Sequence, residues 1–232
     1  MKKIGIPAWV MGNGFGVTIP YIDFFSNFGI VEIIMHNETV PRDIDLLVIP
    51  GGPDVDTARY LRPGEDISLY TQKPCPQRER FDRVLLPQYI ANRVPIFGIC
   101  RGHQTLAVQF GGGLIQDMYH ETNGEDRVKK VHRVSVNRQA VSWIPDAPTT
   151  VYEVNSIHHQ VVDPNRLPAN ATVMLTHVPK TGAINQTGEI EGLSYYPHYP
   201  AFTLQYHPEE IHDDLSIALI RRLLSESDER TI

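Results

Sequence analysis

The 232-residue sequence predicts an α/β fold, with a mostly parallel central sheet flanked by helices and a smaller β-rich layer. Two stretches support the parallel sheet: IVEIIMH (30–36) and DLLVIPGG (45–52) are almost continuously apolar, as strands covered on both faces are. Helical patterns alternate with such runs up to about residue 110, whereas short β-type segments follow beyond residue 117. This change of pattern predicts that the β-rich layer comes from the second half of the chain.

The first half contains alternating strands and helices. Thr18 is a plausible N-cap and Pro20 lies in the first turn of the helix that follows the first strand. A longer helix over 77–93 contains Pro87, which costs about 3 kcal/mol in a regular helix interior, so we expect a kink or break there. The elements expected in this half are strands at 2–10, 30–36, 45–52 and 94–99 and helices at 18–29, 77–93 and 101–110.

Beyond residue 117 the pattern predicts short strands and one final helix. Leu215, Leu219 and Leu223 recur at helical spacing, and Asp213 and Asp214 stand near the start of this helix, where the helix dipole favours acidic groups. The β-type segments lie near 131–137, 150–154, 171–176, 188–195 and 201–206.

Composition narrows the class of protein. The formal net charge is −6 and no long basic cluster is present, which argues against nucleic acid or an anionic membrane as a partner and favours a small molecule. No run approaches the roughly 18 to 20 apolar residues of a membrane span. We expect a single domain over residues 1–232, because a chain of this length fits one large α/β domain. We expect it in the cytoplasm, because only two cysteines are present and the N-terminus does not resemble a signal peptide. No metal-ligand spacing is found, so no metal or other cofactor is expected.

One cysteine occupies a distinctive position. Cys100 stands between Gly98 and Gly102, where a strand at 94–99 meets a helix at 101–110. This G-x-C-x-G turn is typical of a nucleophile elbow, because small neighbours permit a sharp turn and the helix start offers free N–H groups to a thiolate or an oxyanion. A buried structural cysteine is an equally good interpretation of these five residues alone.

A base and its partner follow near the end of the chain. In FTLQYHPEE, His207 comes just after an apolar strand, Pro208 prevents the strand from continuing, and Glu209 stands two residues further on. An extended segment places residues two apart on the same side, so Glu209 can orient the His207 ring. A surface histidine is the commoner reading of a lone His at a strand end, but the adjacent carboxylate favours catalysis.

Together these motifs resemble the class I glutamine amidotransferase family, which implies a Cys-His-Glu triad and a flavodoxin-like sheet. Four further stretches resemble its γ-glutamyl-γ-aminobutyrate hydrolase branch: VIPGGPDVDTARY, GICRG, GGGLIQD and VNSIHHQVVD. The resemblance extends from about Asp45 to Glu209, whereas the first 40 residues match only in general layout.

The resemblance implies a role for each site residue. Cys100 is the nucleophile, His207 the base and Glu209 its orienting partner; the N–H of Gly51 or Gly52, with that of Arg101, forms the oxyanion hole. Gln104, Asp54 and His158 are expected to contact the substrate, and at most one of His158 and the adjacent His159 is expected to line the pocket. The implied reaction is hydrolysis of a γ-glutamyl amide through a γ-glutamyl thioester.

Some residues depart from the pattern. His103 gives GHQ, which is more typical of domains that deliver ammonia to a synthase, Thr203 stands where the family commonly has Gly, and Ala107 where the hydrolase branch usually has Asn. A glutaminase subunit with a separate synthase partner is therefore the alternative, and a catalytically silent binding protein is a third possibility. The aromatic residues at 195–199 either form a wall for the leaving amine or are loop packing.

Overall fold

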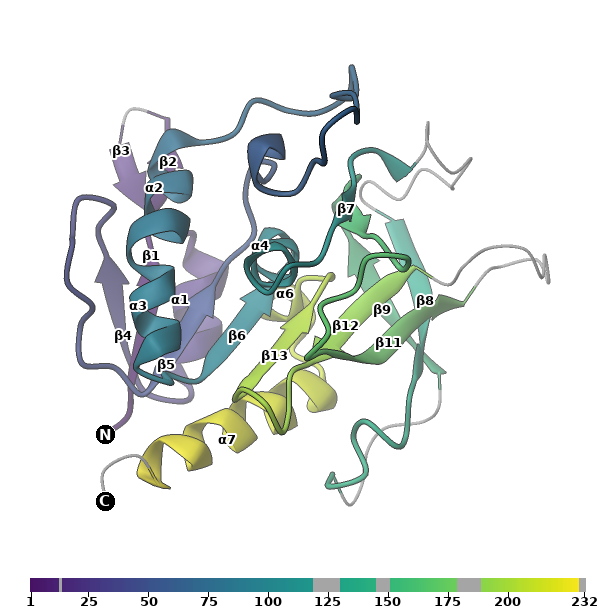
Figure 1. Ribbon diagram of the computed structural model, residues 1–232. Coiled ribbons are helices and arrows are strands. Elements are labelled where there is room, and N and C mark those ends of the chain that lie inside the picture. The colour runs from purple at the N-terminus through teal and green to yellow at the C-terminus, as the bar shows by residue number, and fades with distance from the viewer. Residues whose placement is uncertain (13, 119–129, 145–150, 179–188, 230–232) are drawn as a thin grey trace.

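The protein is built around one nine-stranded mixed sheet, in the order β4-β1-β5-β6-β13-β12-β11-β8-β9 (Figure 1). The computed structural model describes residues 1–12, 14–118, 130–144, 151–178 and 189–229. The α/β architecture predicted from the sequence is confirmed.

The first part of the sheet is parallel. Its strands are β4 (Ile30–Ile34), β1 (Lys3–Pro7), β5 (Leu46–Ile49), β6 (Ile96–Ile99) and β13 (Ala201–Leu204). Each pairs in parallel with its neighbour. Numbered in chain order among themselves, these strands lie 2-1-3-4-5, the flavodoxin-like order that the resemblance implies.

The second part of the sheet is antiparallel. From β13 onward it consists of β12 (Ile190–Ser194), β11 (Thr172–Val178), β8 (Lys130–Val136) and β9 (Val151–Ser156). These strands and β13 account for all five β-type segments expected beyond residue 117. The β-rich part of the chain thus extends the parallel strands edge to edge within the same sheet.

Two short strand pairs lie outside the main sheet. Strand β2 (Trp9–Met11) forms a hairpin with β3 (Gly14–Gly16), and β7 (Leu114–Ile115) pairs with β10 (Val161–Val162). The β7–β10 pair joins the segment after Cys100 to the loop after β9, so both halves of the chain meet near the cysteine.

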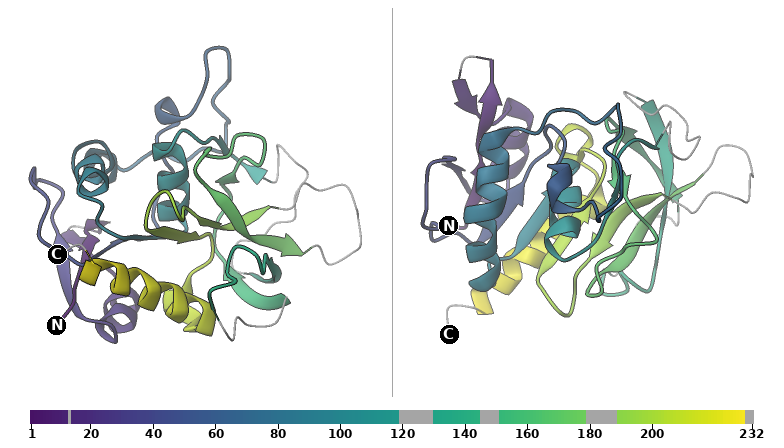
Figure 2. Two further views of the ribbon diagram at one scale, coloured as in Figure 1. Left: turned by 60° about the horizontal axis from the view of Figure 1, so that its bottom comes forward. Right: turned by 45° about the horizontal axis from the view of Figure 1, so that its top comes forward.

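Helices cover both faces of the parallel strands (Figure 2). On one face lie α1 (Ile19–Ser26) and α7 (Asp214–Glu229), where Phe24 and Phe25 share a core with Leu215 and Leu219. On the other face lie α2 (Pro76–Val84), α3 (Leu86–Ala91) and α4 (Arg101–Gln109). A short 3₁₀ helix, η1 (Thr57–Arg59), follows β5, and α6 (Pro208–Ile211) follows β13.

The break expected at Pro87 is present. Helix α2 ends at Val84 and α3 begins at Leu86, so Pro87 falls in the first turn of a new helix, where its missing N–H costs nothing. In the part of the chain that the structure describes, no helix is long and apolar enough to span a bilayer.

Candidate active site

Cys100 lies at the turn between β6 and α4, at the carboxyl edge of the parallel strands. Its backbone has φ 52° and ψ −107°, a conformation that non-glycine residues rarely adopt and that costs energy wherever it occurs. The Cys100 N–H donates to the Leu204 carbonyl on the neighbouring strand at 2.8 Å, which fixes the turn against β13. The backbone geometry is that of a nucleophile elbow.

The flanking glycines are required by close approach of the backbone. A Cβ at Gly98 would lie 2.8 Å from the Gly102 carbonyl oxygen, and a Cβ at Gly102 would overlap the Ile49 carbonyl oxygen. Neither position can hold a side chain without moving β5 or α4, so the G-x-C-x-G pattern follows from the tight packing of the turn.

His207 reaches the cysteine from the adjacent strand. Strands β6 and β13 pair in parallel with Ile99 opposite Leu204, so the residues that follow them emerge at the same edge. His207 Nδ1 lies 2.7 Å from Glu209 Oε1, and the Glu209 side chain is buried. A Cβ placed on Gly51 would lie 2.9 Å from His207 Cε1 and 3.6 Å from Cys100 Cβ, which shows how closely the three residues are packed.

Electrostatics favour a protonated His207. Burial lowers the pKa of His207, but its interactions with the Cys100 sulfur and with Glu209 outweigh this effect and raise the pKa to about 11. At neutral pH the ring is an imidazolium held between a sulfur and a carboxylate. This arrangement suits proton donation to a leaving amine.

Asn155, at the end of β9, holds the His207 backbone from both sides. The His207 N–H donates to Asn155 Oδ1 at 2.9 Å, and Asn155 Nδ2 donates to the His207 carbonyl at 3.1 Å. This role of Asn155 could not be predicted from the sequence, because it lies 52 positions from His207 and belongs to no local motif with it.

The backbone N–H groups around Cys100 differ in their availability. The Gly51 N–H donates to Tyr21 Oη at 2.9 Å, whereas Gly52 lines the cavity beside Cys100. Of the two glycines expected to supply an oxyanion donor, Gly52 is therefore the one whose N–H is not engaged by Tyr21. The Arg101 N–H is at the first position of α4, where no intrahelical acceptor exists.

The Arg101 side chain points away from the cysteine into a buried ionic cluster. Its Nη2 atom lies 2.6 Å from Glu79 Oε1 and 2.8 Å from Asp82 Oδ2. Asp82 also pairs with Arg59 at 2.8 Å. The Arg101 side chain thus anchors α4 to α2, and only its main chain is positioned to act at the site.

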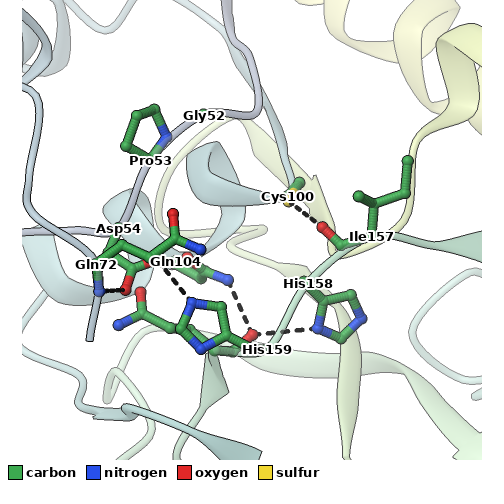
Figure 3. Close-up of a pocket in the computed structure, with 10 residues that line it drawn as sticks. Gly52, Pro53, Asp54, Gln72, Cys100, Gln104, Ile157, His158 and His159 are labelled. Atoms are coloured by element: carbon green, nitrogen blue, oxygen red, sulfur yellow. Dashed lines mark hydrogen bonds and ion pairs between the residues drawn. The ribbon is translucent and has the colours of Figure 1, made fainter. Parts of the chain in front are cut away.

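A cavity of about 300 Å³ opens beside Cys100 (Figure 3). Its lining contains all three residues expected to contact a substrate, and Ile157, whose carbonyl lies 4.0 Å from Cys100 Sγ. The lining residues are Gly52, Pro53, Asp54, Gln72, Cys100, Gln104, Ile157, His158, His159 and Gln160.

Both histidines of the pair line this cavity, so the expectation that at most one would do so was wrong. Strand β9 ends at Ser156, and the segment that follows has no regular alternation to send neighbouring side chains to opposite faces. His158 Nδ1 lies 3.2 Å from the Gln160 carbonyl, which also accepts from Gln104 Nε2 at 3.0 Å. This carbonyl links the helix after the nucleophile to the loop after β9.

His159 bridges two carboxylates at the far end of the cavity. Its Nε2 lies 3.0 Å from Asp54 Oδ1 and its Nδ1 lies 3.3 Å from Asp117 Oδ2. The hydrogen bond with Asp54, together with Asp117, outweighs burial and raises the pKa of His159. The remaining Asp54 oxygen accepts the Gln72 N–H at 2.7 Å, so Asp54 joins the loop before α2 to the loop after β9.

The aromatic residues at 195–199 do not form a wall near the cysteine. Tyr195 and Tyr199 are buried against Phe110, with ring centroids 5.1 and 5.6 Å apart. The Tyr199 hydroxyl donates to the carbonyl of Val94, which precedes β6 and so lies at the opposite edge of the sheet from Cys100. The alternative of loop packing is the correct one.

Two of the residues that depart from the family pattern contact each other. His103 Nδ1 lies 2.7 Å from Thr203 Oγ1, and both side chains are fully buried. Burial lowers the pKa of His103 to about 3, so the ring is neutral. Across the described residues, no cluster of three or more His, Cys, Asp or Glu side chains could hold a metal ion.

Comparison with known proteins identifies the family of the chain. Residues 29–209, which include Cys100, His207 and Glu209, match the Peptidase C26 family. The chain belongs to the peptidase C26 family. The γ-glutamyl-γ-aminobutyrate hydrolase branch is a finer assignment, which the match to peptidase C26 does not make.

Curated relatives of this peptidase C26 member include amidotransferase-like proteins. A putative glutamine amidotransferase-like protein of Lactococcus lactis is 31% identical over 156 residues, covering 61% of this chain and 63% of that protein. The carbamoyl phosphate synthase small chain of Bacillus cereus is 28% identical over 209 residues, covering 90% of this chain and 49% of the relative. The chain therefore spans less than two thirds of either protein.

The same fold is found in a solved structure. A putative GMP synthase subunit from Thermoplasma acidophilum superposes with a TM-score of 0.66 at 19% identity, covering 99% of this chain and 95% of that one. At this level of identity the similarity establishes the fold alone.

Proposed function

We propose that the protein hydrolyses the γ-glutamyl amide bond through a γ-glutamyl thioester on Cys100. The observation that carries the proposal is that Cys100 lines the cavity and that the His207–Glu209 pair follows the adjacent strand. Peptidase C26 membership and the amidotransferase-like names of its relatives are consistent with amide hydrolysis.

The proposed acylation step uses groups that surround Cys100. The Cys100 thiol gives its proton to His207, and the thiolate sulfur attacks the side-chain carbonyl carbon. The carbonyl oxygen takes up negative charge facing the N–H groups of Gly52 and Arg101. The carbon–nitrogen bond then breaks, and the proton of the His207 imidazolium passes to the departing amine. A γ-glutamyl thioester and a neutral His207 remain.

Deacylation returns the site to its starting state. Neutral His207 takes a proton from water as the water oxygen attacks the thioester carbonyl, and the carbon–sulfur bond breaks to release glutamate. His207 is again protonated, and Glu209 keeps its ring in the orientation that both steps need. A reducing compartment such as the cytoplasm suits a reaction that depends on a free thiol.

The polar lining of the cavity suits the α-amino and α-carboxyl end of a γ-glutamyl substrate. Asp54, His159 and Gln104 provide both signs of charge and an amide near Cys100, as a free α-amino and α-carboxyl group require. Specificity for the glutamyl side is therefore expected to exceed specificity for the leaving amine.

A substrate panel with purified protein tests this proposal. The panel contains glutamine, γ-glutamyl-γ-aminobutyrate, γ-glutamyl-putrescine, and α-glutamyl and β-aspartyl controls, with Cys100→Ser as the blank. Faster turnover of γ-glutamyl amines than of glutamine supports the hydrolase. Equally fast cleavage of the α-linked control contradicts the proposal.

A glutaminase subunit that delivers ammonia to a separate synthase is the second candidate. It is favoured by the GHQ sequence at 102–104 and by the names of two similar proteins, a carbamoyl phosphate synthase small chain and a putative GMP synthase subunit. Ammonia release from glutamine, measured with the protein alone and with cell extract added, separates the candidates. Release that depends on the extract supports this second candidate.

A further inference from the structure

Gly51 is held on both sides by buried side chains. Its N–H donates to Tyr21 Oη at 2.9 Å, and its carbonyl accepts from Arg78 Nη1 at 3.0 Å. Arg78 Nη2 also donates to the Pro50 carbonyl at 2.8 Å. Tyr21 is 4% exposed and Arg78 is 0% exposed, so these hydrogen bonds are shielded from water.

Arg78 is an unusual residue to bury for packing alone. Among the described residues, no carboxylate lies within ion-pair distance of its guanidinium, in contrast to Arg101, which pairs with Glu79 and Asp82. A buried arginine without a bound carboxylate is costly, and here its strong donors are directed at the two carbonyls that precede Gly52.

The contact to the Gly51 carbonyl determines where the next N–H points. A peptide group is planar and trans, so its carbonyl and its N–H point in opposite directions. Because Arg78 fixes the Gly51 carbonyl, the Gly52 N–H is directed away from Arg78. Gly52 lines the cavity beside Cys100, and an N–H directed toward that cavity would face the position where an oxyanion would form.

Trp9 packs against both residues that hold Gly51. The Arg78 guanidinium lies 5.6 Å from the centroid of the Trp9 ring, and the Tyr21 ring meets Trp9 edge to face at 6.0 Å. These three side chains come from β2, α1 and α2. Three separate elements therefore support the two side chains that hold Gly51.

We infer that Tyr21 and Arg78 are positioning residues that clamp Gly51 and thereby hold the Gly52 N–H as an oxyanion donor. The inference rests on the proposed function, since it concerns the transition state of that reaction. We call Tyr21, Arg78 and their hydrogen bonds to residues 50 and 51 the Gly51 clamp.

Tyr21→Phe is the sharpest test, because it removes one oxygen atom and keeps the ring. Tyr89→Phe is a matched control: Tyr89 is also buried, and its hydroxyl also accepts a backbone N–H at 2.9 Å, from Arg42, far from Cys100. Loss of an oxyanion donor costs about 10²- to 10³-fold, so we expect a misaligned donor in Tyr21→Phe to lower kcat about 10- to 100-fold with little change in KM. Tyr89→Phe should stay within about twofold of the wild type in both constants.

A second measurement separates the oxyanion from the nucleophile, because Tyr21 Oη also lies 3.5 Å from His207 Nδ1. Alkylation of Cys100 by iodoacetamide displaces iodide and forms no oxyanion. If the clamp acts on Gly52, the alkylation rate and its pH profile in Tyr21→Phe remain within about twofold of the wild type while turnover falls. A parallel loss of alkylation and turnover would show that Tyr21 acts through His207 and overturn the clamp.

A third measurement does not depend on activity. In protein with ¹⁵N-labelled glycine, the Gly51 amide should exchange with solvent at least about tenfold faster in Tyr21→Phe than in the wild type. Equal exchange rates overturn the inference, even if the wild type hydrolyses none of the panel. Arg78→Met should also lower kcat, and unchanged turnover in a folded Arg78→Met protein contradicts its role.

Discussion

The parallel and antiparallel parts of the sheet place different residues at the candidate active site. The parallel strands β5, β6 and β13 end side by side. Cys100 follows β6 directly, and Gly52 and His207 come shortly after the ends of β5 and β13. The antiparallel part contributes the end of β9 and the irregular segment 157–160, which closes one side of the cavity.

The groups proposed to react and the groups proposed to bind substrate are held in place in different ways. The groups proposed to react are held by strand register and by tight backbone contacts at glycines, so small shifts are resisted. Segment 157–160, on the antiparallel side of the cavity, is held by side-chain hydrogen bonds such as those of His159 with Asp54 and Asp117. Substitutions on the parallel side should therefore change kcat, whereas those on the opposite wall should change KM.

The largest effect is expected for the nucleophile and its base. Cys100→Ser and His207→Ala should each reduce amidase activity about 10⁴-fold, because bond formation and proton transfer are both lost. Steady-state kinetics on the best γ-glutamyl substrate measures this. Near-normal turnover in Cys100→Ser would show that another group performs the attack.

Glu209→Gln should have a smaller effect, about 10- to 100-fold in kcat, because orientation of the ring is weakened while the reacting groups remain. Glu210→Gln is the control, since Glu210 lies on the same helix but is exposed. Similar losses in the two variants would mean that the helix, or its contact with Asn155 through Glu210, and not the Glu209 carboxylate, is responsible.

Glu209→Gln should also change the dependence of activity on pH. Glu209 helps to raise the pKa of His207 to about 11, so the imidazolium of the wild type persists until the pH rises toward that value. Without Glu209 the pKa falls, and the alkaline loss of activity should begin at lower pH. NMR titration of His207 and the rate profile should shift together; an alkaline limb that does not move would contradict this.

Asp54→Asn tests the antiparallel side of the cavity through His159, because Asp54 itself follows the parallel strand β5 but holds the His159 ring. It removes the charge that holds His159 and weakens the contact with the Gln72 N–H, so we expect KM to rise about tenfold with kcat little changed. Asp56→Asn, two residues away and outside the cavity lining, should leave KM within about twofold. A fall in kcat without a change in KM would assign Asp54 to the reacting groups instead.

The smallest effect on activity is expected for the buried contact between Thr203 and His103. Thr203→Val removes the hydroxyl next to His103 Nδ1 and should lower the free energy of unfolding by about 1 to 3 kcal/mol, while turnover stays within about twofold. Urea denaturation and kinetics on the same sample test this. Unchanged stability would mean that the contact contributes nothing.

The sequence predicted the parts of the molecule that depend on local pattern. The apolar runs, the break at Pro87 and the turn around Cys100 are encoded within a few residues each, and the structure has them where they were expected. The sequence did not predict the roles of Tyr21, Arg78 and Asn155. Their hydrogen-bond partners lie 30, 27 and 52 positions away, and contacts at such separations produce no short sequence motif. The role of the tyrosines at 195–199 stayed open for the same reason, since only the strand order shows that they lie at the far edge.

The contact between His103 and Thr203 also bears on how such a sequence diverges. The two residues are 100 positions apart and face each other inside a core that has no room to spare, since a Cβ at Gly98 would lie 2.8 Å from the Thr203 methyl carbon. Glycine at 203 would remove the hydroxyl that His103 Nδ1 contacts, and a different residue at 103 would remove the same contact from the Thr203 side. The two positions are thus expected to be epistatic: each constrains which mutations the other tolerates, and a lineage would cross from one combination to the other only through a less stable intermediate.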